Sequence, residues 1–314
     1  MPGFSFQTRQ SLWNDIENQD WDIIIIGGGI TGAGIARQAA YYGLRTCLIE
    51  KKDFASETSS HSSKLIHGGL RYLEYFELSL VYESLHEKNL LMYKVAPHLV
   101  RPLPFIIPVW KGGKYGPFLT GLGLTLYDLL ASFRNYKNHR KLSLSEVAEI
   151  EPLLDISQIR DAFLYYDCQT DDARLTLETI LSAYEAGASP LNYVEASRII
   201  MENGRFTGLE LRNTINGEEK RIHGKVLVNA TGPFINSFLS EQGLLEKPLL
   251  RPTKGVHIIL PHEAFPVSHA ITFTSAVDGR VMFILPWHGY TLIGTTDTAG
   301  NPEEDKEATP KDIE

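Results

Sequence analysis

Three glycines and one glutamate at fixed spacing are the first residues of this chain that could bind a cofactor. Gly27, Gly29 and Gly32 form the pattern Gly-x-Gly-x-x-Gly, and Glu50 follows Gly32 by eighteen residues. The first glycine of such a pattern allows a tight turn, the second lets backbone approach a pyrophosphate, and the third lets a helix pack on a strand. A carboxylate at this remove can accept a hydrogen bond from a ribose 2′-hydroxyl. The segment therefore predicts a site for an adenine dinucleotide without a 2′-phosphate.

The densest polar cluster of the chain follows Glu50 closely. It runs from Thr58 to Tyr72 and carries hydroxyl, ammonium, imidazole and guanidinium groups. Hydroxyls and backbone N–H groups at this place can bond a pyrophosphate and the edge of a flat ring, and Gly68 and Gly69 allow the backbone to pass close to that ring. The alternative is a serine-rich surface loop, but such loops seldom hold lysine, histidine and arginine in this order. We therefore expect the cluster to continue the cofactor site.

Two strands and the helix between them must position these groups. The β-branched run Ile23–Ile26 is typical of a strand that is buried on both faces. The next stretch has apolar residues on one helical face and ends at Gly43, and Thr46–Ile49 returns as a second strand. The helix N-terminus then presents unpaired N–H groups and the positive end of its dipole to the phosphates. This order of elements distinguishes the pattern from a chance run of glycines.

Apolar periodicity predicts further elements along the chain. We expect a helix over 74–96 that Pro97 ends, and another that begins at Asp171 and Asp172 and ends at Gly187. Prolines at 97, 102, 104 and 108 mark the entry into a second domain, and 98–155 has no clear period. Strands are expected over 162–166, 191–196, 206–212, 218–223, 225–229 (a buried strand), 256–260, 281–286 and 291–295, with a hairpin turn at 216–217.

This order predicts an α/β protein with a two-part, Rossmann-like dinucleotide-binding domain and a parallel sheet, interrupted by a mostly antiparallel substrate domain. The dinucleotide-binding domain is expected over 20–96 and 156–235, and the substrate or cap domain over 97–155 and 236–314. The residues Thr309 to Asp312 are typical of a helix start, yet the chain stops at Glu314. We therefore expect a chain that is truncated at its C-terminus and lacks part of the dinucleotide-binding domain.

Composition narrows the class of protein. The 314 residues are 43% hydrophobic and 22% charged, as in globular proteins, and the net charge of −8 argues against a nucleic-acid-binding surface. The two cysteines, Cys47 and Cys168, lack metal-ligand spacing, so no metal is expected, and Cys47 lies in a predicted strand as a core residue. The acidic N-terminus has no apolar stretch of signal-peptide length, which predicts a cytoplasmic protein.

One apolar stretch, 117–133, is a candidate for membrane contact. It has a single charged residue, Asp128, and basic residues follow at 134, 137, 140 and 141. The stretch is too short and too rich in glycine to span a bilayer. Two interpretations stay open, which are a buried helix and a helix that lies on an anionic membrane surface.

Together these motifs resemble those of the FAD-dependent aerobic (respiratory) glycerol-3-phosphate dehydrogenases. The resemblance extends from about Asp22 to Asp297. It implies oxidation of sn-glycerol 3-phosphate to dihydroxyacetone phosphate by hydride transfer to flavin N5 of FAD, with electrons passed to a respiratory quinone. The dinucleotide-binding domain is then an FAD-binding domain. Besides the glycine pattern, the matching segments are Ser62–Tyr72, Asp171–Leu175, Val228–Pro233, Lys254–His257 and Ile293–Asp297.

The resemblance also implies roles for single residues. His67 is the first candidate for the base that takes the C2 hydroxyl proton, because its place in the loop resembles that of a flavin-adjacent histidine in related oxidases. His257 is the second candidate, and a structural role is the alternative for either. Arg71 is expected to clamp the phosphate, because a guanidinium can bond phosphate in a bidentate manner. The other expected substrate residues are Tyr72, Lys254 and Thr296, the last in a loop, 295–297, whose alternative is a plain hairpin turn.

The residues expected to bind the cofactor form a larger set along the same segments. They are Gly27, Gly28, Gly29, Thr31, Gly32, Glu50, Lys51, Thr58, Ser59, Ser60, Ser63, Lys64, Leu65, His67, Val194, Ala230, Thr231 and Gly232. The resemblance further implies a peripheral position on the inner face of the cell membrane, beside the quinone, and allows a homodimer.

Two other functions stay open. One is an FAD-dependent oxidase of the same superfamily that acts on an amine or a 2-hydroxy acid, which should lack Ser62–Tyr72 as written here. The other is a non-catalytic, truncated flavin-fold fragment, in which case the FAD site is incomplete.

Overall fold

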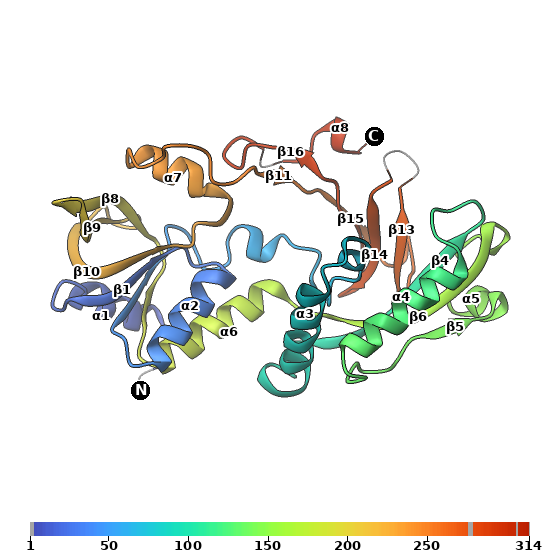
Figure 1. Ribbon diagram of the computed structural model, residues 1–314. Coiled ribbons are helices and arrows are strands. Elements are labelled where there is room, and N and C mark those ends of the chain that lie inside the picture. The colour runs from blue at the N-terminus through green and yellow to red at the C-terminus, as the bar shows by residue number, and fades with distance from the viewer. Residues whose placement is uncertain (1–2, 276–278, 306, 314) are drawn as a thin grey trace. The chain divides into compact units, whose positions relative to one another are not determined.

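A computed structural model describes residues 3–275, 279–305 and 307–313, which divide into two compact units (Figure 1). Unit 1 holds the described residues of Met1–Ser62, Asp171–Pro252 and Asn301–Lys306, and unit 2 holds those of Ser63–Thr170, Thr253–Gly300 and Glu307–Glu314. The chain passes from unit 1 to unit 2 after residue 62 and returns to unit 1 after residue 170, so the segment 63–96 belongs to unit 2. The assignment of an FAD-binding and a substrate domain to the predicted ranges stays a prediction.

Unit 1 is built on a six-stranded sheet with the order β7–β2–β1–β10–β9–β8. The first four strands pair in parallel, and the pairs that β9 makes with β10 and β8 are antiparallel. Both strands predicted around the glycine pattern are confirmed, with Ile23 opposite Thr46. The strands of this sheet are β7 (Ser189–Leu191), β2 (Thr46–Ile49), β1 (Trp21–Ile26), β10 (Glu219–Asn229), β9 (Arg205–Asn213) and β8 (Val194–Glu202).

Alternate residues of β1 and β2 face two separate apolar cores, because side chains alternate between the faces of a strand. Ile25 and Leu48 pack with α2 (Ile30–Tyr41) and α6 (Asp172–Glu185), which lie side by side (Figure 1). Ile24 and Cys47 pack on the other face with residues of α1 (Phe6–Asp15). Burial raises the pKa of the Cys47 thiol, so this cysteine is a core residue, as predicted.

The start of α6 follows the sequence prediction. The Asp171 carboxylate accepts a hydrogen bond from the Arg174 N–H at 3.0 Å and so caps the helix, which ends before Gly187. The remaining helices of unit 1 are short: η1 (Thr58–Ser60), η5 (Gly232–Phe234) and α7 (Ile235–Glu241).

Two strand boundaries predicted in unit 1 are wrong. The ranges 218–223 and 225–229 form one strand, β10, whose first half pairs with β9 and whose second half pairs with β1; its Val226 is 51% exposed rather than buried. The expected strand over 191–196 is divided between β7 and β8, because Tyr193 adopts a positive φ of 53° that a strand does not continue through. The hairpin through 216–217 is confirmed.

Unit 2 holds an eight-stranded sheet that is mostly antiparallel, as predicted. Its order is β12–β15–β14–β13–β4–β6–β3, with β5 also paired to β6, and only β13 and β4 pair in parallel among the pairs of the described residues. A two-stranded sheet joins β11 (Thr253–Lys254) to β16 (Thr298–Ala299). The larger sheet consists of β3 (Leu65–Ile66), β4 (Arg101–Trp110), β5 (Arg140–Leu142), β6 (Ile159–Gln169), β12 (His257–Pro261), β13 (Ala270–Thr274), β14 (Val281–Trp287) and β15 (Tyr290–Gly294). The α/β fold class is therefore confirmed.

Two of the described helices of unit 2 lie in 98–155, where the sequence had no clear period, and the others lie outside that segment. The helix expected over 74–96 begins later, because Phe76 has a φ of 57° and separates η2 (Leu70–Tyr75) from α3 (Leu78–Leu90). The chain then continues through a short π-helix, η3 (Leu91–Val95). The other helices are α4 (Pro117–Leu130), α5 (Leu144–Ile150), η4 (Ile156–Gln158) and α8 (Pro310–Ile313).

Helix α4 has two different faces, and only one of them is buried, so the interpretation of 117–133 as a buried helix holds for one face alone. Leu124, Tyr127 and Asp128 are buried, whereas Phe118 is 84% and Leu122 is 54% exposed. Hydropathy along the sequence could not separate the two faces, because both are rich in leucine. Nowhere in the described residues does a helix reach the length and apolarity needed to cross a membrane.

Truncating a side chain between α6 and the sheet should lower the free energy of unfolding more than the same change at the surface. Ile180 is fully buried against α2 and β2, whereas Ile215 is 56% exposed in the β9–β10 turn. We expect Ile180→Ala to cost about 2–5 kcal/mol, since it removes buried methyl groups and leaves a cavity. Ile215→Ala is the matched control and should cost under about 0.5 kcal/mol in the same urea titration. Equal losses would contradict this description of the core.

Candidate functional site

The turn between β1 and α2 has no room for side chains at two of its glycines. Gly27 has a φ of 111°, and a Cβ there would collide with the carbonyl oxygen of Ala230. A Cβ on Gly32 would collide with the carbonyl oxygen of Gly27. Helix α2 begins directly after Gly29 and has no side-chain cap. Its first N–H groups are therefore available to an anion, except that Ile30 N–H donates to Ser59 Oγ at 2.9 Å.

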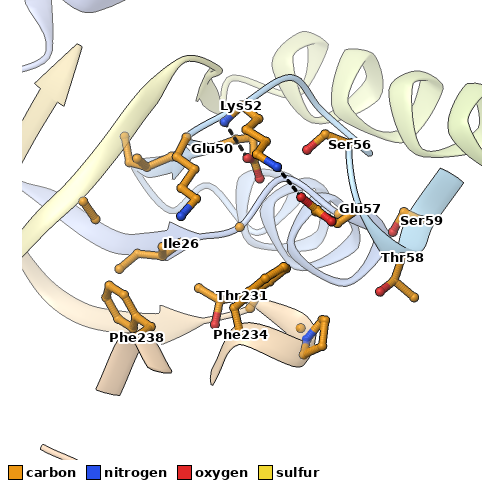
Figure 2. Close-up of a pocket in the computed structure, with 18 of the residues that line it drawn as sticks. Ile26, Glu50, Lys52, Ser56, Glu57, Thr58, Ser59, Thr231, Phe234 and Phe238 are labelled. Atoms are coloured by element: carbon orange, nitrogen blue, oxygen red, sulfur yellow. Dashed lines mark hydrogen bonds and ion pairs between the residues drawn. The ribbon is translucent and has the colours of Figure 1, made fainter. Parts of the chain in front are cut away.

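A pocket of about 280 Å³ lies beside this turn, within unit 1 (Figure 2). It collects the carboxyl ends of β1, β2 and β10, where a parallel sheet binds ligands, together with the start of β8 and the loop that holds η1. The predicted cofactor residues that line it are Gly27, Gly29, Thr31, Glu50, Lys51, Thr58, Ser59, Val194, Ala230, Thr231 and Gly232.

Glu50 is oriented by two backbone donors. Its Oε2 accepts the Gly28 N–H at 2.8 Å, and its Oε1 accepts the Lys52 N–H at 2.8 Å. A carboxylate oxygen can accept more than one hydrogen bond, so Glu50 still offers acceptors to a ribose hydroxyl. Gly28, Gly32 and Ser60 are not among the lining residues. Gly28 and Gly32 support the turn, and Ser60 Oγ donates to the Glu57 carbonyl at 3.1 Å.

The sequence analysis missed several residues of the pocket. Lys52 and Glu57 both line it and form an ion pair (Figure 2). Phe234 and Phe238 line it from η5 and α7, four residues apart and thus one helical turn apart. Two aromatic residues at this spacing, directly after the segment that ends at Pro233, are the signal that could have found them.

The lining fits an adenine dinucleotide of the predicted kind. The N-terminus of α2 suits a pyrophosphate, and the glycine turn leaves backbone atoms, rather than side chains, against it. The Glu50 carboxylate suits free ribose hydroxyls and would repel a 2′-phosphate. The residues present therefore fit FAD.

The other predicted residues lie in unit 2, where two segments meet at Ser63 and His257. Ser63 Oγ lies 2.9 Å from His257 Nε2. Thr296 binds the residue before His257, because its Oγ1 accepts the Val256 N–H at 2.9 Å. The structure thus brings Ser63, His257 and Thr296 together, although almost 200 residues separate the first two.

The same part of unit 2 contains a tryptophan that was not among the predicted site residues. Lys64 Nζ lies 5.4 Å from the centroid of the Trp287 ring, a cation–π contact. Among the described residues, Trp287 Nε1 is buried and has no hydrogen-bond partner. A buried donor without a partner costs free energy, which a ligand oxygen would offset.

His67 is exposed, and its ring is oriented by a neighbouring amide. The Gly69 N–H donates to His67 Nδ1 at 3.1 Å. A neutral imidazole that accepts at Nδ1 carries its proton on Nε2, so Nε2 of His67 is a donor in this arrangement. His257 Nε2 faces a hydroxyl, which can either donate or accept. The identity of the base stays a prediction.

The predicted substrate residues Arg71, Tyr72 and Lys254 have different surroundings. Arg71 and Tyr72 are exposed residues of η2. Lys254 Nζ instead forms an ion pair with Asp312 Oδ2 at 2.7 Å, and this contact, together with two hydrogen bonds from Thr309, lowers the pKa of the Asp312 carboxyl to about 2. A substrate phosphate would have to compete with Asp312 for Lys254.

Comparison with known proteins gives consistent matches. The family of FAD dependent oxidoreductases matches residues 22–314. A protein of Staphylococcus haemolyticus (strain JCSC1435) named aerobic glycerol-3-phosphate dehydrogenase is 37% identical over 305 residues, which are 97% of this chain and 55% of that protein. Its namesake from Bacillus subtilis (strain 168) is 38% identical over 295 residues, which are 94% of this chain and 53% of that one.

One solved structure extends these matches to three dimensions. The glycerol-3-phosphate dehydrogenase from Bacillus halodurans complexed with FAD superposes with a TM-score of 0.76 at 32% identity, over 95% of this chain and 51% of that chain. The chain thus spans about half the length of the curated relatives it matches.

Adding one methyl group to the glycine turn should abolish FAD binding. Gly27→Ala places a Cβ against Ala230 at a φ that alanine rarely adopts, so the turn must shift. Gly34→Ala is the matched control, because the same methyl group on α2 meets no atom within 4 Å. It should keep FAD and raise the free energy of unfolding by about 0.5–1 kcal/mol. Flavin absorbance after gel filtration measures retention, and retention by Gly27→Ala would refute this account of the turn.

Proposed function

Because the chain belongs to the family of FAD dependent oxidoreductases, we propose that it forms the FAD pocket and part of the substrate site of an enzyme that oxidises sn-glycerol 3-phosphate to dihydroxyacetone phosphate. The observation that carries the proposal is the occurrence, in one chain, of the Gly27–Glu50 pocket and the polar Ser62–Tyr72 segment. Similarity to proteins named aerobic glycerol-3-phosphate dehydrogenase over 97% of this chain supports the choice of substrate.

Anaerobic flavin reduction tests the substrate. Glycerol 3-phosphate should bleach the flavin absorbance of the full-length, FAD-loaded protein, whereas an amine or a 2-hydroxy acid should leave it unchanged. Bleaching by either of the latter would favour the alternative oxidase, and no bleaching by any of them would refute the proposal.

The residues of unit 2 suggest a division of roles in the reaction. When bound, FAD would supply the acceptor for the hydride that leaves C2 of the substrate. His67 donates from Nε2 to the C2 oxygen, because its Nδ1 is occupied by Gly69. His257, with Ser63 at its Nε2, takes the hydroxyl proton. This reverses the order in which the resemblance ranked the two histidines. The exposed guanidinium of Arg71 binds the phosphate.

These two roles respond differently to glutamine, whose side-chain N–H can donate but which is not a base. His257→Gln should slow flavin reduction by glycerol 3-phosphate by about 10²–10⁴-fold, as expected for loss of a general base. His67→Gln keeps a donor, although at a shifted position, and should slow it by only about tenfold, whereas His67→Ala loses the donor and should slow it more. Anaerobic stopped-flow absorbance measures the rates. If His67→Gln slows flavin reduction more than His257→Gln does, His67 and not His257 is the base.

Electrons from the reduced flavin are proposed to pass to a respiratory quinone, with the protein held at the inner face of the cell membrane by α4. The exposed residues Phe118, Leu119 and Leu122 give this helix an apolar outer face, and the exposed Arg134 and Lys137 follow it. An apolar face beside cationic side chains suits the surface of an anionic bilayer.

Removing one apolar side chain from α4 should weaken vesicle binding. Leu122→Ser loses the burial of one leucine in lipid, about 1.5 kcal/mol or roughly a tenfold weaker partition. Leu153→Ser is the matched control, since Leu153 is 52% exposed and Leu122 is 54% exposed, but Leu153 lies beyond α5. Co-sedimentation with phosphatidylglycerol vesicles measures the partition. Equal binding of both variants would exclude α4 as the contact.

A further inference from the structure

A charged pair is buried in the apolar core of unit 2. Lys88 Nζ lies 2.9 Å from Asp167 Oδ1, and the two side chains are 1% and 2% exposed. The pair lies next to a core cluster that includes Val81, Leu85 and Phe105. Apolar residues can often replace such a pair without loss of stability, because burying two charges costs as much as their attraction returns. Stability alone is therefore a weak reason for the pair.

The pair belongs to a hydrogen-bonded network that joins α3, β6 and α4. Lys88 Nζ also donates to Asn135 Oδ1 at 2.9 Å and to the carbonyl oxygen of Tyr166 at 3.4 Å. The Tyr127 hydroxyl donates to Asp167 at 2.8 Å. The Asp167 carboxylate therefore accepts hydrogen bonds from an ammonium and from a phenol, and both contacts hold it in place.

This network reaches the segment that carries His67. The Gly68 N–H donates to the Tyr127 hydroxyl at 2.8 Å and, at a longer 3.3 Å, to Asp167 Oδ1. A Cβ on Gly68 would collide with Leu85 and lie 2.5 Å from the Tyr127 hydroxyl oxygen. The backbone of the turn is thus packed directly on α3 and α4. The next amide, Gly69 N–H, is the one that orients His67.

Asp167 sets the direction of the Tyr127 hydroxyl. Since the carboxylate accepts its proton, the hydroxyl turns a lone pair to the Gly68 N–H. Burial, together with the charge of Asp167, raises the pKa of Tyr127 well above its usual range, so the phenol stays protonated. It acts as donor and acceptor in fixed directions.

We propose that Tyr127, held by Asp167 and Lys88, is a positioning residue for His67: it binds the Gly68 amide and so places the Gly69 N–H that orients the imidazole. The inference rests on the proposed function, in which His67 donates to the substrate oxygen. A tyrosine that serves only to fill the core would affect stability, whereas a positioning residue also affects the rate, because small displacements of a reacting group cost rate.

The test compares Tyr127→Phe with Tyr165→Phe in the full-length, FAD-loaded protein. Tyr165 is a matched control, because it is buried in the same core, with its ring centroid 5.9 Å from that of Tyr127. Among the described residues, the Gly68 amide bonds Tyr127 and Asp167 and not Tyr165. Melting temperature, kcat and KM for glycerol 3-phosphate, and amide hydrogen exchange of residues 66–72 are measured for each.

Both variants should lower the melting temperature, since each loses a buried hydroxyl. Only Tyr127→Phe should lower kcat, by about 10–100-fold with KM changed less than about threefold, because the imidazole is misplaced. Only Tyr127→Phe should also speed exchange in 66–72, by about tenfold or more, since the Gly68 amide loses its closer acceptor. Equal kcat and equal exchange in the two variants would overturn the inference.

A second variant keeps the test decisive if Tyr127→Phe does not fold. Gly68→Ala pushes the turn away from Leu85 and Tyr127 and leaves the Lys88–Asp167 pair intact, so it should reproduce both the loss of kcat and the faster exchange. Wild-type values for Gly68→Ala would overturn the inference. The exchange measurement needs no substrate, so it decides the anchoring even if the wild-type protein fails to oxidise glycerol 3-phosphate, an outcome that would refute the proposed function instead.

Discussion

Close backbone packing at the β1–α2 turn is the constraint on which unit 1 depends. Gly27 N–H donates to the Ile49 carbonyl and Ala230 N–H to the Ile26 carbonyl, each at 2.8 Å, so the turn is tied to both neighbouring strands. Gly32 then brings α2 against the carbonyl of Gly27. The carboxyl ends of three parallel strands and a helix N-terminus converge as a result, and the pocket is the space that remains beside them.

Two of the side chains with proposed chemistry, Glu50 and His67, share one structural feature, which is orientation by a local backbone amide. Glu50 accepts from Gly28 and Lys52, and His67 accepts from Gly69. Such amides leave the remaining acceptor sites of the Glu50 carboxylate and the Nε2 of His67 available to a ligand. A turn is flexible unless something fixes it, and in unit 2 the buried Tyr127 and its partner Asp167 bind the turn beside His67.

Helix α4 shows how one element can serve two surroundings. Its period of 3.6 residues places Leu124 and Tyr127 in the core of unit 2 and Phe118 and Leu122 on the outside. The inner face contributes to the polar network, and the outer face is the one proposed to meet a membrane. A buried helix does not describe it, because its outer face is exposed although it is apolar.

The sequence by itself determined the features that depend on local spacing: the strands β1 and β2, the glycine turn, the position of Glu50 at a strand end, and the capped start of α6. The tertiary structure decided the partners that meet across long stretches of chain. Tyr127 reaches Gly68 across 59 residues and Asp167 reaches it across 99, while β10 pairs with two different strands. Lys254 forms an ion pair with Asp312, and Phe238 lines the pocket. Local spacing restricts backbone torsion angles, but a hydrogen-bond partner or a buried face exists only once packing has brought distant segments together.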